Sequence, residues 1–99
     1  MIGPSYRNQK LRDLASQAPH CMCCWTSKSG QIVGAHSNRI ADGKGKGIKA
    51  HDLLAYVCQN CHTVIDGPGD KTERHNLFLQ AFFNTTLWLL NEGHLEVKR

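Results

Sequence analysis

Two pairs of cysteines in this sequence share the spacing of metal-binding turns. Cys21 and Cys24 are separated by two residues, and so are Cys58 and Cys61. A C-x-x-C turn directs two thiolates toward one point, and Zn²⁺ takes four such soft ligands at about 2.3 Å in a tetrahedral site. The two turns therefore predict a structural zinc site with four cysteine ligands, which has no open coordination position and supplies folding energy rather than catalysis.

The fifth cysteine, Cys23, lies outside this set. An odd number of cysteines, together with an N-terminus that lacks a secretory apolar stretch, argues against a disulfide framework. We therefore expect a cytoplasmic protein whose thiols are free or metal-bound. Cys23 is then a buried thiol, or it replaces Cys21 or Cys24 as a ligand. The plain alternative is that the cysteines are ordinary buried residues.

A second group of residues has the chemistry for hydrolysis of phosphodiesters. His62 follows the second cysteine pair and Asp66 lies four residues later, so a helix would place both on one face, about 5–6 Å apart at Cβ. Such a pair can hold one divalent cation, Mg²⁺ or Mn²⁺, at a scissile phosphate. His36 ends a short apolar run, and imidazole suits a general base that activates water.

Each of these residues also has an alternative role. His36 could be a hydrogen-bonded histidine at the end of a strand. His62 could replace a cysteine as a zinc ligand or support the zinc site from outside. Asp66 could be an ordinary carboxylate at the end of a helix, since Gly67 follows it. It is the combination with the two cysteine pairs that favours a catalytic site.

The basic residues of the chain are concentrated in its first half. The formal net charge is +4, and residues 21–50 together carry +4. The glycine-rich stretch 41–47 predicts a loop. Four cationic residues near His36, on this loop or beside it, could contact the phosphates of a polyanion such as DNA: Arg39, Lys44, Lys46 and Lys49. Such contacts would be salt-dependent and show little sequence preference, and ordinary solvated side chains are the alternative.

These residues must be positioned by few elements, because 99 residues suffice for one small domain. The longest apolar run, Leu87–Leu90, is far shorter than the roughly 20 residues that cross a bilayer. The pattern predicts a first helix, capped by Ser5 and ending near Pro19. Two antiparallel strands are expected at 31–36 and 55–58, followed by helical turns at 62–66. A long helix should then run from Asp70 to about Asn91, with Gly93 just beyond its end.

Apolar residues cover more than one face of the long C-terminal helix. They are Leu77, Phe78, Leu79, Ala81, Phe82, Phe83, Leu87, Trp88, Leu89 and Leu90. Such a broad band is compatible with burial on two sides, against the domain and against a second subunit in a homodimer. The plainer interpretation, which we favour, is that the whole band forms the core of a very small protein.

Two stretches of this sequence, residues 34–39 and 52–66, resemble the ββα-metal core of HNH (His-Me finger) nucleases. The first contains Ala35-His36, and the second contains C-x-x-C-H followed by Asp66. The chain is also similar in length and order of elements to the small prophage-borne nucleases of the YbcO-like family. This resemblance covers residues from about Leu11 to Val97.

The resemblance implies that His36 is the general base and that His62 and Asp66 hold the catalytic Mg²⁺ or Mn²⁺. In two places the sequence departs from the pattern of the class. The residue before the base is often an acid or a histidine that binds the metal, and here it is Ala35. The middle asparagine of the class is replaced near its position by Asp52. His51, Asp52 or His75 could supply a further ligand.

The sequence thus predicts an α+β fold: a small zinc-stapled ββα-metal finger with an N-terminal helix and a long C-terminal helix, forming one domain over residues 1–99. The expected function is metal-dependent endonucleolytic hydrolysis of DNA in phage recombination or DNA processing, in the cytoplasm of a bacterial host. One alternative is a zinc-containing DNA-binding module without activity, and another is a protein-interaction adaptor that uses the C-terminal helix.

Overall fold

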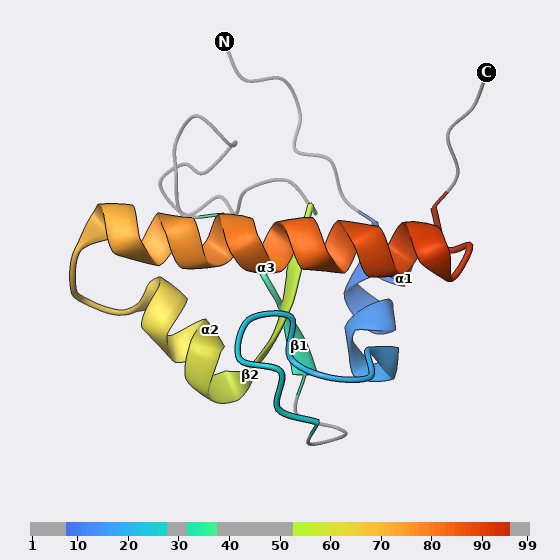
Figure 1. Ribbon diagram of the computed structural model, residues 1–99, viewed down its shortest axis with the longest axis horizontal. Helices are drawn as coiled ribbons and strands as arrows, with labels where there is room; N and C mark the ends of the chain where they lie inside the picture. Colours follow the sequence, from blue (N-terminus) through green and yellow to red (C-terminus); the bar gives the residue numbers. More distant parts are fainter. Residues whose placement is uncertain (1–7, 28–31, 38–52, 96–99) are drawn as a thin grey trace, which may run out of the picture.

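The computed structural model describes residues 8–27, 32–37 and 53–95, which form a small α+β structure. The helices and strands, in chain order, are α1 (Gln9–Asp13), the short 3₁₀ helix η1 (Leu14–Gln17), β1 (Ile32–Ala35), β2 (Ala55–Cys58), α2 (Gln59–Asp66) and α3 (Lys71–Asn91). In Figure 1, α3 spans the longest dimension, α2 lies beneath its N-terminal half and α1 beneath its C-terminal half. The predicted α+β class and the two flanking helices are confirmed.

The two strands form an antiparallel sheet that leads directly into a helix. Ile32 lies opposite Cys58, and Ala35 lies opposite Ala55. All four residues of β2 are buried, which explains why the strand is a continuous apolar run. The next helix, α2, starts at Gln59, three residues before the predicted helical turns at 62–66, because the second C-x-x-C turn is itself the first turn of the helix.

The N-terminal helix begins later than predicted. The cap is Asn8, whose Oδ1 accepts a hydrogen bond from the backbone N–H of Leu11 at 3.1 Å. The expected cap, Ser5, is therefore wrong, and Ser5 itself lies outside the described residues. Asparagine satisfies the free N–H groups of the first turn as well as serine does. Leu11 and Ala15 on this segment are buried in the core.

The long helix has the predicted signals at both ends. At its start, the Oδ1 atom of Asp70 accepts a hydrogen bond from the backbone N–H of Glu73 at 3.0 Å. At its end, Gly93 adopts a positive φ of 76°, and the N–H of His94 donates to the carbonyl of Leu89 at 2.8 Å. This pattern is a Schellman motif, which favours glycine. Although α3 has 21 residues, no helix in the described ranges combines the length and apolar content needed to cross a membrane.

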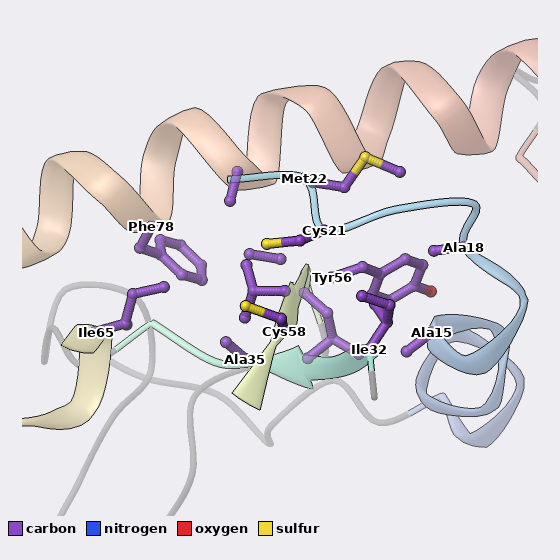
Figure 2. Packing of buried hydrophobic residues seen from close by; sticks show 14 of the residues in the cluster. Ala15, Ala18, Cys21, Met22, Ile32, Ala35, Tyr56, Cys58, Ile65 and Phe78 are labelled. Carbon is purple, nitrogen blue, oxygen red and sulfur yellow. The ribbon is translucent and has the colours of Figure 1, made fainter. Parts of the chain in front are cut away.

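The core lies between the sheet and α3. Tyr56 and Val57 of β2 are fully buried, together with Met22 from the first cysteine turn, and Ile65 of α2 is 2% exposed. Figure 2 shows Phe78 of α3 at one side of this cluster, next to Ile65. The core therefore fixes the two cysteine turns, β1 and α2 relative to one another.

Candidate metal centre

Four cysteines from the two C-x-x-C turns converge on one point. The Sγ atoms of Cys21, Cys24, Cys58 and Cys61 all lie within 4.8 Å of one another, and those of Cys24 and Cys58 are 3.7 Å apart. Tetrahedral zinc with bonds of about 2.3 Å separates its sulfur ligands by about 3.8 Å. The predicted set is thus positioned to bind a metal ion such as zinc.

The first turn is shaped by hydrogen bonds to Cys21. The backbone N–H groups of Cys23 and Cys24 both donate to its Sγ at 3.4 Å, and the N–H of Trp25 donates to its carbonyl at 3.0 Å. The N–H of Met22 donates to the carbonyl of Tyr56 on β2 at 2.9 Å. The last bond ties the first turn to the strand that carries the second turn.

The second turn is built at the junction of β2 and α2. Cys58 is the last residue of β2 and also the N-cap residue of α2, while Cys61 lies in the first turn of that helix. The extended backbone of Cys58 and the helical backbone of Cys61 direct both thiols toward Cys24. A metal at this centre would therefore join the chain before β1 to the start of α2.

The surroundings of the thiols set which of them ionises first. Burial acts to raise the pKa of Cys21, but backbone hydrogen bonds from Cys24, Cys58 and Cys23 outweigh it and lower this pKa from 9.0 to about 7. Burial raises the pKa of Cys61, and the neighbouring thiols raise it further. Because thiolates bind metal, protons compete with the metal at this centre, and binding releases them.

The remaining cysteine, Cys23, lies beside the centre rather than in it. Its side chain is half-buried, and burial raises its pKa even though its thiol interacts with that of Cys61. The four-cysteine group does not include it. Of the roles predicted for Cys23, a partly buried thiol next to the metal ligands agrees with this position.

His62 and Asp66 meet on the exposed side of α2. The Nε2 atom of His62 lies 2.9 Å from Oδ2 of Asp66, and the two side chains are 30% and 45% exposed. The predicted shared helix face is therefore present, one residue beyond the metal-ligand position Cys61. Both polar groups are accessible to a ligand from solvent.

His36 follows the last residue of β1 and is half-buried. Its neighbour Ala35 is fully buried opposite Ala55, and both belong to the core. β1 packs against α2, and Figure 2 shows Ala35 in the same core as Ile65, which precedes Asp66 in the chain. The fold thus brings the end of β1 to the helix that carries His62 and Asp66.

One cation near α2 was not singled out from the sequence. Arg74, in the first turn of α3, donates a hydrogen bond from Nη1 to the carbonyl of Ile65 at 3.4 Å. The charge of Arg74 therefore lies at the C-terminal end of α2, beside Ile65, which precedes Asp66 in the sequence. No local pattern could have found it, because the contact depends on how α3 folds back on α2.

Several predicted site residues lie outside the described ranges. They are Arg39, Lys44, Lys46, Lys49, His51 and Asp52. His75, a candidate for a further metal ligand, lies on α3, where its ring stacks on that of Phe78 with centroids 5.9 Å apart. This contact gives His75 a packing role.

Comparison with known proteins does not assign the chain to a family. No family model, no curated protein and no solved structure matches it. Its function must be argued from its own residues.

Proposed function

We propose that this protein is a metal-dependent endonuclease of the HNH type that hydrolyses DNA phosphodiester bonds. The observation that carries the proposal is the contact of His62 with Asp66 on α2, one residue beyond a four-cysteine centre. The β1–β2–α2 order supports it, since a histidine directly follows the first strand and the paired polar groups lie on the helix packed against that strand.

The His62–Asp66 pair suits a hard divalent cation. Neighbouring ligands of an octahedral ion with bonds of about 2.1 Å are about 3.0 Å apart. The Nε2–Oδ2 distance of 2.9 Å is close to this value. Two protein ligands leave the remaining positions to water and phosphate oxygens, which is the usual arrangement of Mg²⁺ at phosphate sites. Such an ion would neutralise charge on the scissile phosphate and on the leaving oxygen.

The proposed reaction begins with His36 as general base. His36 accepts a proton from water, and the water oxygen attacks the phosphorus atom in line with the leaving 3′ oxygen. A bond forms between the water oxygen and phosphorus, and the bond from phosphorus to the 3′ oxygen breaks. The 3′ oxygen takes up a proton from solvent water, and the products carry a 5′-phosphate and a 3′-hydroxyl group. His62 and Asp66 would hold the cation that positions the phosphate for this attack.

The four-cysteine centre has a structural role in this proposal. Zn²⁺ bound by Cys21, Cys24, Cys58 and Cys61 would have no open position for substrate. It would instead fix the first turn of α2, from which His62 projects. The formal net charge of +4 falls to about +2 when four thiolates hold Zn²⁺, because the filled centre carries −2. The remaining positive charge and the position of Arg74 favour a polyanion as substrate, with Arg39, Lys44, Lys46 and Lys49 as further phosphate contacts.

The direct test is cleavage of plasmid and branched DNA by the purified, zinc-loaded protein. We expect nicking that requires added Mg²⁺ or Mn²⁺ and that is lost in His36→Ala and Asp66→Asn. The added cation should be omitted rather than chelated, because a chelator would also remove zinc. The matched control is His94→Ala, since His94 is an exposed histidine at the far end of α3. Zinc content by elemental analysis and helicity by circular dichroism must stay unchanged in every variant.

The same experiment separates the proposal from a DNA-binding module without activity. Complete burial of Ala35 favours this second candidate, because the position that often carries a metal ligand in the class is here part of the core. Salt-dependent DNA binding without cleavage on any substrate would contradict the nuclease and support the binding module. Cleavage that survives in both His36→Ala and Asp66→Asn would remove these residues from the mechanism. A bacterial cytoplasm and a phage or prophage setting remain part of the proposal.

A further inference from the structure

The solvent-facing side of α3 carries a row of large apolar residues. Leu79, Phe83, Leu87 and Leu90 follow one another at intervals of four, four and three residues, which places them along one face of a helix. Their side chains are 45%, 64%, 44% and 43% exposed. We call these four residues the outer stripe.

The outer stripe is not a margin of the core. The residues of α3 that are buried in the core are Phe78, Ala81, Thr85 and Leu89. With about 100° of rotation per residue, the centres of the two sets lie on nearly opposite sides of the helix. The helix is therefore apolar on two faces, and the described part of the chain covers only one of them. The four side chains of the outer stripe together expose roughly 300 Å² of apolar surface, which is in the range of patches that mark interaction sites.

We propose that the outer stripe is the interface of a homodimer in which α3 packs against α3 of a second copy, in antiparallel orientation. The inference stands independently of the proposed nuclease activity. Of the two alternatives for the apolar band, core or dimer interface, it assigns the outer stripe to the dimer and names the face that takes part.

Charge is the first argument for a second copy. No residue from Asn76 to Asn91 is charged. A face without cations is unsuited to DNA, and a face without any charge has no complement for a charged protein partner. Two identical neutral faces meet without like-charge repulsion, although each chain carries a net charge of +4. Antiparallel packing also places each helix N-terminus near the C-terminus of its partner, which the helix dipoles favour.

Spacing and area are the second argument. Intervals of four and three residues are those that let two helices pack side by side along a seam. A stable interface buries about 800 Å² per partner. The outer stripe supplies roughly 300 Å² of this area, and its neighbours along the interface supply the rest. Phe82 and Thr86 of α3 line an apolar hollow of about 210 Å³ between the outer stripe and the core, whose other walls include the half-exposed Leu53 and the core residues Tyr56 and Leu89.

The test is the mass of the full-length, zinc-loaded protein by sedimentation equilibrium over a wide range of concentrations. We expect twice the monomer mass of 11.1 kDa for the wild type. Phe83→Glu and Leu87→Glu should each weaken the dimer at least about a hundred-fold, because two-fold symmetry removes every contact twice and buries two charges. Both positions are exposed in the monomer, so both variants should keep their helicity and zinc.

The matched control is Val64→Glu, which places the same charge on a 52% exposed aliphatic position of α2, outside the outer stripe. This variant should dimerise like the wild type. A wild-type chain that stays monomeric at every concentration would overturn the proposal and assign the outer stripe to a different partner. A dimer that survives both Phe83→Glu and Leu87→Glu would overturn it as well, since the interface would then lie elsewhere.

Discussion

The backbone N–H of Tyr56 on β2 donates a hydrogen bond to the hydroxyl oxygen of Thr85 on α3 at 2.9 Å. The same hydroxyl donates to the carbonyl of Ala81 at 2.7 Å. Tyr56 and Thr85 are both fully buried. Within the described residues β2 has a neighbouring strand on one side only, so the polar groups on its other edge need partners. Thr85 satisfies the N–H of Tyr56, and Met22 satisfies its carbonyl.

The first prediction concerns this hydroxyl. Thr85→Val keeps the shape of the side chain but leaves the N–H of Tyr56 buried without an acceptor, so we expect the free energy of unfolding to fall by about 1–3 kcal/mol. Thr85→Ser keeps the hydroxyl and should lose less. Urea unfolding of the zinc-loaded variants measures both. Equal stability of the valine variant and the wild type would show that the bond contributes nothing.

Local features of the site were predictable because they follow from spacing along the chain. The i, i+4 relation brought His62 to Asp66, and the spacing of Asp70 and Glu73 gave the start of α3. The convergence of the two cysteine pairs was also predictable, because each C-x-x-C turn fixes its own geometry and one metal wants four ligands.

Features that depend on contacts between distant segments were not predictable. The bond between Tyr56 and Thr85 joins residues 29 positions apart, and Arg74 reaches Ile65 only because α3 folds back on α2. The cap of the first helix was misplaced, because several residues near the N-terminus, Ser5 and Asn8 among them, can cap a helix. Sequence spacing does not choose between such residues.

The second prediction distinguishes the metal ligands from the spare thiol. We expect Cys21→Ser to lose bound zinc and the cooperative unfolding transition, because a structural zinc contributes about 10–16 kcal/mol at pH 7, which is as large as the whole stability of a small domain. Cys23→Ser should keep zinc at one ion per chain, since Cys23 lies outside the four-thiol group. Elemental analysis and thermal unfolding provide the measurement. Loss of zinc in both variants would make Cys23 a ligand after all.

The third prediction is a loss of stability at high pH. Burial raises the pKa of Tyr56 from 10.0 to about 12. The folded state therefore holds the phenolic proton more tightly than the unfolded state. The protonated phenol of Tyr56 therefore contributes to the free energy of unfolding. This contribution is complete below about pH 10, falls as the pH rises toward 12, and amounts to at most about 2–3 kcal/mol. Tyr56→Phe has no such proton and should show a flatter profile between about pH 10 and pH 12. Parallel profiles for the two proteins, measured by urea unfolding, would contradict the assignment.

The last prediction concerns Trp25, which follows the first cysteine turn with a positive φ of 67° and a side chain that is 58% exposed. The hydrogen bond from its N–H to the carbonyl of Cys21 requires the chain to turn back here. A left-handed backbone costs a residue with a Cβ atom roughly 1–2 kcal/mol, and glycine avoids this cost. The only ring contact that Trp25 makes in the described residues is with His20, at 4.3 Å between centroids.

At most positions an alanine variant is more stable than a glycine variant, and at Trp25 we expect the opposite order of stability. Trp25→Gly relieves the strain and loses only a partly exposed contact, so we expect a stability near that of the wild type. Trp25→Ala keeps the strain and loses the same contact, so it should be less stable than the glycine variant by about 1 kcal/mol. Urea unfolding of the two zinc-loaded variants gives the difference directly. An alanine variant at least as stable as the glycine variant would mean that this turn does not impose the left-handed conformation.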